Sequence, residues 1–117
     1  DPREPHAAAA LRAAGAELVS LPVRDDGGFA PADVLAWLAT RQANEVLVEA
    51  GPRLAGAFLA ARCVDELVVY LAPHLLGQDA SPLAVLPRIE SMGERLQFEV
   101  RDVAAFGPDL RLTLVPA

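Results

Sequence analysis

Lysine is absent from the 117-residue sequence, and cysteine occurs once. Without a lysine amine the chain can build neither a Walker-type phosphate loop nor a Schiff-base enzyme. Its one cysteine, Cys63, cannot form an internal disulfide, which suits a reducing cytoplasm. We therefore set aside these two classes of enzyme and the disulfide-rich scaffolds, and expect a cytoplasmic protein.

Long apolar runs and basic stripes are also missing. Charged residues or prolines break every apolar stretch before it reaches the roughly 18–20 residues that cross a bilayer. The net charge is −6 and the arginines are dispersed, whereas nucleic-acid binding needs clustered positive charge. We expect no membrane span and no nucleic-acid partner. The hydrophobic content of 53% is enough for the core of one domain.

The first residues contain neither an initiator methionine nor a basic head followed by an apolar segment. We therefore expect no signal peptide. Pro2 and Pro5 at the start indicate that the chain begins inside a longer protein.

Helix-forming and strand-forming segments alternate over the first two thirds of the sequence. Alanine-rich and amphipathic stretches predict helices, and compact apolar runs predict buried strands. The expected order is a helix over 6–14 capped by Gly15, a strand over 17–21, a turn over 25–28, a helix opening at Pro31 or Asp33, a strand over 45–49, a helix over 53–62 and a strand over 67–72. This alternation is typical of an α/β fold with a mostly parallel sheet.

The periodicity changes near the end of the chain, where apolar and polar residues alternate. Leu96, Phe98 and Val100 form one alternating run, and a second run covers 110–114. The segment 106–109 joins them through Gly107 and a proline. This pattern predicts an antiparallel pair with one buried face at the C-terminal edge of the sheet.

The segment from Glu49 to Ala57 is the most informative part of the sequence. A strand ends at Glu49, the chain turns at Gly51, and Pro52 stands where the first turn of a helix tolerates proline. Unpaired backbone N–H groups and the helix dipole at such a turn favour a phosphate. Spacing alone leaves an alternative open, in which 51–52 is a plain turn and Gly56 is a helix-packing glycine.

Glu49 ends an otherwise apolar strand. A buried carboxylate requires partners, and the carboxyl end of a parallel strand faces the ligand crevice in open α/β sheets. Glu49 therefore either contacts a ligand or forms a salt bridge with a neighbouring arginine.

Three blocks in this order and spacing closely resemble the reductase domain of the bifunctional riboflavin-biosynthesis deaminase/reductase. They are Val48-Glu-Ala-Gly-Pro-Arg-Leu-Ala-Gly-Ala57, Val64-Asp-Glu-Leu67 and Tyr70-Leu-Ala-Pro-His-Leu-Leu-Gly77. The resemblance runs from about Ala14 to the end of the chain. It implies a dihydrofolate-reductase-like three-layer fold, of which residues 1–117 form the C-terminal part of a single NADP-binding reductase domain.

The resemblance also implies an activity, namely the NADPH-dependent reduction of 5-amino-6-(5-phosphoribosylamino)uracil to its ribitylamino product. Substrate binding falls on Glu49, and no residue is assigned a certain catalytic role. Cofactor binding falls on Gly51, Pro52, Arg53, Leu54, Ala55, Gly56 and Ala57.

The sequence departs from the family at two points. The N-terminal strands of the reductase domain are absent, and a single Cys63 without H-x-E and C-x-x-C patterns cannot build the deaminase's zinc site. We therefore expect no metal site. Two alternatives remain, a nucleotide-binding or oligomerisation fragment without activity and a related enzyme with another substrate. The edge left by the missing strands favours a homo-oligomer.

Overall fold

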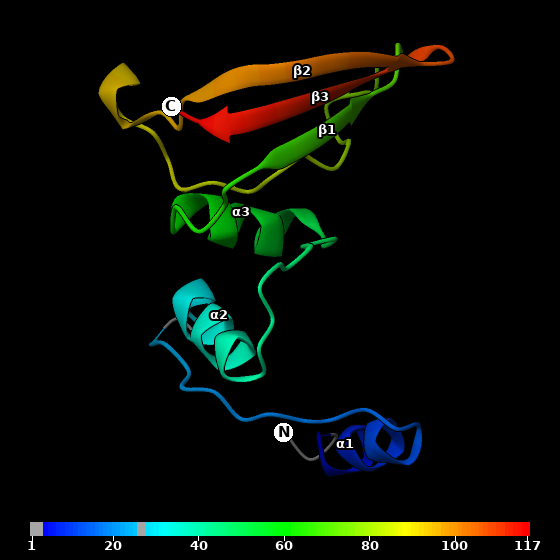
Figure 1. Cartoon of the computed structure of the whole chain (residues 1–117), viewed down its shortest axis with the longest axis vertical. Helices are drawn as coiled ribbons and strands as arrows, with labels where there is room; N and C mark the ends of the chain where they lie inside the picture. Colours follow the sequence, from blue (N-terminus) through cyan, green and yellow to red (C-terminus); the bar gives the residue numbers. More distant parts are fainter. Residues whose placement is uncertain (1–3, 26–27) are drawn as a thin grey trace.

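A computed structural model describes residues 4–25 and 28–117 and arranges them in successive tiers (Figure 1). A sheet lies at one end, followed by α3, α2 and α1 (Figure 1). The elements are α1 (Glu4–Ala13), α2 (Pro31–Thr40), α3 (Pro52–Ala60), β1 (Leu67–Leu71), the 3₁₀ helix η1 (Met92–Glu94), β2 (Phe98–Phe106) and β3 (Asp109–Pro116).

The sheet has the strand order β1-β3-β2, and both pairings are antiparallel. The predicted C-terminal antiparallel pair is confirmed as β2 and β3, joined at Gly107, whose φ of 59° suits a tight turn. The expectation of a mostly parallel sheet is not met, because β1 pairs with β3 and no parallel pair forms within residues 4–25 and 28–117.

Two predicted strands, over 17–21 and 45–49, are wrong for this structure. Neither segment has regular secondary structure, and neither pairs with another strand of the described chain. A strand exists only where a neighbour completes its hydrogen bonds, so an apolar pattern alone does not produce one. Val46, Leu47 and Val48 are 41%, 82% and 37% exposed as a result.

The sheet has one entirely apolar face. The pairing register places Leu67, Val100 and Leu114 in one row, and Val69, Val103 and Leu112 in the next. A β-bulge between Val100 and Asp102 makes this possible, because one extra residue restores the alternation on β2. The apolar positions on this face are Leu67, Val69, Leu71, Phe98, Val100, Val103, Ala105, Leu110, Leu112, Leu114 and Pro116.

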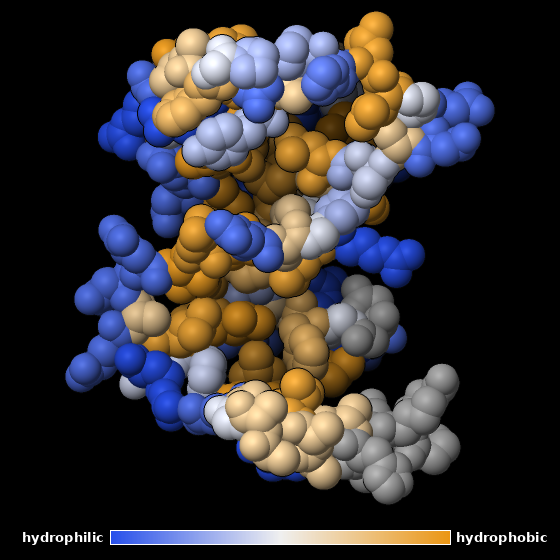
Figure 2. All heavy atoms as spheres, turned by 90° about the vertical axis from the view of Figure 1, so that its right-hand side faces the viewer, coloured by the Kyte–Doolittle hydropathy of each residue, from blue (hydrophilic) through white to orange (hydrophobic). Residues whose placement is uncertain are grey.

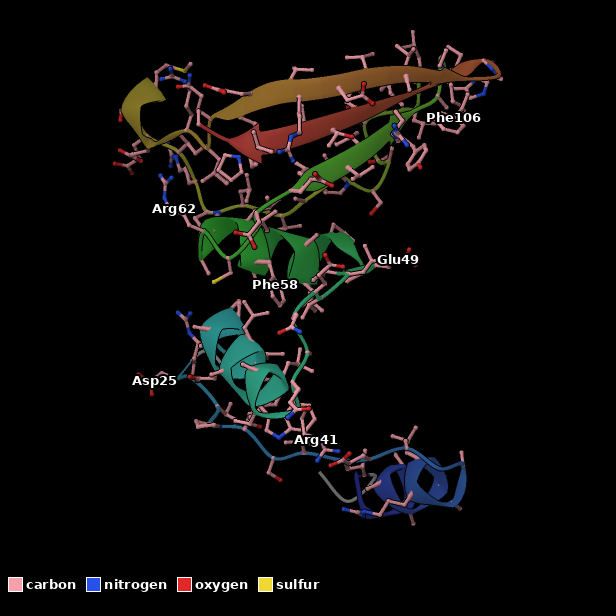
Figure 3. The ribbon with its side chains drawn as sticks, in the orientation of Figure 1. Asp25, Arg41, Glu49, Phe58, Arg62 and Phe106 are labelled. Atoms are coloured by element: carbon pink, nitrogen blue, oxygen red, sulfur yellow. The ribbon has the colours of Figure 1, made fainter. Side chains whose placement is uncertain are left out.

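Helix α3 lies at the centre of the fold. Its side chains Phe58 and Leu59 are the buried hydrophobic residues of the described chain, at 4% and 8% exposure. Phe58 lies on the side of α3 that faces α2 (Figure 3), and Leu59 lines a hollow together with Phe98 and Pro116 of the sheet. Neighbouring helix positions point about 100° apart, so one helix contacts both layers.

The chain is open for its length. Its radius of gyration is 17.4 Å, against about 13 Å for a compact domain of this size. Its accessible surface is 9612 Å², against about 6,100 Å² for a folded monomer of 12.3 kDa. Apolar residues accordingly gather at the surface on the side that carries the β2–β3 turn and the start of α3 (Figure 2). Surface of this kind marks an interaction region.

The residues on either side of the predicted turn over 25–28 pair with each other. The Arg24 N–H donates to the Gly28 carbonyl at 2.8 Å, and Val23 forms an isolated antiparallel bridge with Phe29. Asp26 and Gly27 lie outside the described residues.

Among the described residues, none of the helices has the length and apolar character that a membrane crossing requires.

All three α-helices end in the same way. The residue after each C-cap adopts a left-handed conformation, and two backbone N–H groups turn back to the last carbonyls. Gly15 fills this position in α1, as predicted, whereas Gln42 and Arg62 fill it in α2 and α3 with φ of 61° and 54°. A side chain with a Cβ is strained there.

We expect Arg62→Gly to stabilise the folded chain by about 1 kcal/mol and to raise its melting temperature by about 4 °C. The reason is that glycine adopts the left-handed conformation without the Cβ clash. Thermal unfolding followed by circular dichroism measures the change. Arg62→Ala is the matched control, since it removes the guanidinium and keeps the strain. An equal gain from both variants would contradict the explanation.

Candidate functional site

The start of α3 presents free backbone donors. Gly51 is the N-cap residue, with φ −64° and ψ 167°, and Pro52 occupies the first helical position. No side chain caps this end. The N–H groups of Gly51, Arg53 and Leu54 have no acceptor among the residues that the structure describes. They form a small cluster of donors at the positive end of the helix dipole.

Within α3 itself, no negative charge opposes an anion at this position. The first turn of α3 contains no acidic residue, and the side chain of Arg53 is exposed without an ion pair in the described chain. Ala55 and Ala57 are half-buried, and Leu54 is 51% exposed. The predicted segment 51–57 thus forms the N-cap and the first turns of α3, and the Arg53 side chain is exposed to solvent.

The two glycines of the turn differ in their surroundings. A Cβ built on Gly51 would meet nothing within 4 Å, so the space beside this backbone is open. A Cβ built on Gly56 would overlap the carbonyl oxygen of Val85 and lie 2.9 Å from its nitrogen. Gly56 is buried, and its space is filled by the chain's own backbone. The helix-packing role that the sequence leaves open for Gly56 is therefore the one seen.

Val85 belongs to residues 82–87, here called the strap, which run between α3 and the sheet (Figure 1). The Val85 N–H donates to the carbonyl of Pro52 at 2.9 Å. Sequence reasoning misses this contact, because it is made by backbone groups alone. The one available signal is Gly56 itself, since a glycine inside a helix indicates a close approach.

Glu49 lies on the connection that leads into the start of α3 (Figure 3). Its side chain is exposed, and it forms no hydrogen bond or ion pair within the described residues. The alternative of a salt bridge with a neighbouring arginine is therefore not seen there. Glu49 stands two residues before Gly51 in the sequence.

Two hollows of the described chain lie elsewhere on α3. One, of about 140 Å³, is lined by Leu59, Arg62 and residues of the sheet. The other, of about 180 Å³, lies between the end of α3 and 86–96. Both are at the C-terminal end of the helix, so they do not coincide with the donors at its start.

The polar face of the sheet carries a second group of side chains. Arg111 donates to Asp102 at 2.9 Å and lies over the ring of Phe106 at 5.2 Å. Tyr70 meets the same ring edge-on at 6.2 Å. The hydrogen bond to the Asp102 carboxylate raises the pKa of Arg111 above its usual value. The group joins all three strands and lies apart from the start of α3.

Among the described residues, no group of three or more His, Cys, Asp or Glu side chains could hold a metal ion. The arrangement at the start of α3 is suited to binding an anionic group through backbone N–H donors, with one free carboxylate beside it.

Known proteins are similar to this chain in sequence and fold. Residues 5–112 match the family described as RibD C-terminal domain. The riboflavin biosynthesis protein RibD of Escherichia coli (strain K12) is 50% identical over 80 residues, which are 68% of this chain and 22% of that protein. The 5-amino-6-(5-phosphoribosylamino)uracil reductase of Buchnera aphidicola (subsp. Acyrthosiphon pisum) is 37% identical over 83 residues, 71% of this chain and 40% of that protein.

A solved structure of Acinetobacter baumannii RibD superposes with a TM-score of 0.68 at 33% identity. The match covers 82% of this chain and 30% of that one. The likeness supports the dihydrofolate-reductase-like fold that the sequence implies. The chain thus spans about a fifth to two fifths of the length of these curated relatives.

Proposed function

The chain belongs to the RibD C-terminal domain family, and we propose that it forms the cofactor-binding part of an NADPH-dependent reductase in riboflavin biosynthesis. Its substrate would be 5-amino-6-(5-phosphoribosylamino)uracil, after which the Buchnera relative is named. The observation that carries the proposal is the cluster of free N–H donors at the start of α3, beside an open Gly51 and an exposed Glu49.

The residues present fit a dinucleotide phosphate. Gly51, Arg53 and Leu54 offer free N–H groups, and the absence of a Cβ at Gly51 leaves room for a ligand against the backbone. The Arg53 guanidinium is available for a charge-assisted contact with a phosphate oxygen. When bound, the cofactor supplies the hydride. We propose direct contacts for Gly51, Pro52, Arg53, Leu54, Ala55 and Ala57, with Gly56 contributing through packing.

Glu49 is proposed to bind the substrate. A carboxylate accepts hydrogen bonds, and the substrate carries hydroxyl and amine donors. Because Glu49 has no partner within the described residues, it is free to accept them. Fixing these donors would hold the reacting sugar carbon in position, which is a contribution of orientation rather than of proton transfer.

We further propose that the exposed apolar segments are covered in the intact, cytoplasmic protein. The segment 45–49 would enter a parallel sheet of the dihydrofolate-reductase type, since it is apolar and has no pairing partner in the described chain. The apolar face of the three-stranded sheet shares a hollow with α3 at Phe98 and Pro116, and its part around Val100 and Val103, which are 59% and 54% exposed, would contact a second copy.

The function is tested by NADPH titration of the intact protein, followed by turnover with the pyrimidine substrate. We expect saturable binding and substrate-dependent NADPH oxidation. Glu49→Gln should keep NADPH affinity and lower turnover roughly tenfold or more, since it weakens substrate positioning. Glu45→Gln, which removes an exposed carboxylate four residues earlier, is the control. Binding without turnover would favour the inactive-fragment alternative, and turnover with a different pyrimidine only would favour the other-substrate alternative.

Gly51→Ala separates ligand approach from folding. The backbone of Gly51 suits any residue and its surroundings are open, so we expect the unfolding midpoint to stay unchanged. The methyl group would stand where the phosphate approaches, so NADPH affinity should fall roughly tenfold. Gly93→Ala is the control, because its Cβ would meet only Ser91 at 3.7 Å. An unchanged affinity in Gly51→Ala would show that no ligand comes close to this backbone.

Sedimentation velocity tests self-association. We expect the intact protein to form a dimer or larger assembly at micromolar concentration, and Val103→Asp to shift it toward the monomer by placing a charge on the apolar face. Val68→Asp puts the same charge on the opposite face of the sheet, at a residue 43% exposed, and should leave assembly unchanged. A monomeric wild type would contradict the proposal.

A further inference from the structure

One peptide unit of the strap touches α3 at two positions. The Val85 N–H donates to the Pro52 carbonyl at 2.9 Å, and the Val85 carbonyl oxygen occupies the place of the missing Cβ at Gly56. Pro52 and Gly56 stand four residues apart, so they lie on the same face of the helix, one above the other. The strap therefore crosses α3 directly over its first turn.

The contact is made by backbone and not by side-chain burial. The side chain of Val85 is 50% exposed, whereas Gly56 is buried. Any side chain at position 56 would displace the Val85 peptide and break its hydrogen bond to Pro52. The hydrogen bond and the glycine are thus two parts of one contact.

The first turn of α3 lacks a side-chain cap and an acidic residue. The Ala55 N–H donates to the Gly51 carbonyl at 3.1 Å within this turn. Proline at the first helical position offers no N–H of its own. The Val85 N–H attaches the carbonyl of the first helical residue to a segment outside the helix, and it leaves unpaired the N–H groups that a cap would satisfy.

We propose that the Val85 peptide is a positioning element for the cofactor, holding the first turn of α3 so that the N–H groups of Gly51, Arg53 and Leu54 converge on a phosphate. This inference rests on the proposed function and extends it to a residue outside the turn. Val85 does not touch the cofactor; it acts through Pro52 and Gly56. The strap and the cofactor-binding turn then act together, because a shift of the strap would move the N–H groups of the turn away from the phosphate.

The test uses Val85→Pro and Val85→Ala in the intact protein. Proline removes the N–H that reaches Pro52, whereas alanine keeps it and shortens the half-exposed side chain. We expect Val85→Pro to weaken NADPH binding roughly five- to tenfold, the amount that one hydrogen bond supplies. KM for NADPH should rise by the same factor while kcat at saturating NADPH is retained. Val85→Ala should behave as wild type.

Amide hydrogen exchange gives a second readout that needs no cofactor. The Ala55 amide, which donates within the first turn, should exchange roughly five- to tenfold faster in Val85→Pro than in Val85→Ala. Gly56→Ala should have the same effect on exchange by pushing the strap away. This readout applies even if Gly56→Ala is too unstable for kinetic measurements.

The outcomes separate the two proposals. If wild type fails to bind NADPH, the proposed function falls, and the strap's hold on the turn is decided by exchange at Ala55. If wild type binds and Val85→Pro binds as tightly as Val85→Ala, the positioning role is overturned, whatever the exchange rates are. If Ala55 exchanges equally in both variants, the strap does not hold the first turn and the inference also fails.

Discussion

The close approach of two backbones at Gly56 determines how the rest of this chain is arranged. Because the Val85 peptide fills the space of a side chain there, the strap fits between α3 and the sheet. Helix α3 can then bury Leu59 toward the sheet while Phe58 faces α2 (Figure 3). Protein interiors are close-packed, so a methyl group at position 56 would push the strap away from α3. The burial of apolar side chains elsewhere would not compensate for this displacement. The fold around α3 thus depends on one absent side chain.

Local chemistry predicted much of the fold. The end of α1 follows from its alanine-rich segment and Gly15, and the β2–β3 pair follows from alternating residues on either side of a glycine–proline turn. The segments 17–21 and 45–49 were predicted wrongly, since their apolar composition suits a strand but pairing depends on a neighbour distant in the sequence. The antiparallel pairing of β1 with β3 was missed for the same reason. The left-handed residues Gln42 and Arg62 carry no signal in their own chemistry.

In the candidate site, the sequence predicts those residues whose role depends on their side chain or on the lack of one. Gly51, Pro52 and Glu49 are identified, and the structure shows a free N–H at Gly51, proline at the first helical position and a free carboxylate at Glu49 within the described residues. Val85 could not be found in this way, because its contribution is an N–H and a carbonyl that every residue except proline possesses. Sequence also left Gly56 undecided between ligand contact and packing. Only the position of the Val85 peptide distinguishes the two, and that position depends on the whole path from β1 to β2.

That path has a consequence for the order in which the chain folds. The β2–β3 hairpin closes over two residues, so it can form early and locally. Pairing of β1 with β3 closes a loop of almost forty residues, and the strap lies inside this loop. The contact of Val85 with Gly56 closes a shorter loop, with 28 residues between its ends, so its closure costs slightly less entropy than the β1–β3 pairing. Both contacts cost more to close than the hairpin, which makes the hairpin the local starting point on which the two longer loops close.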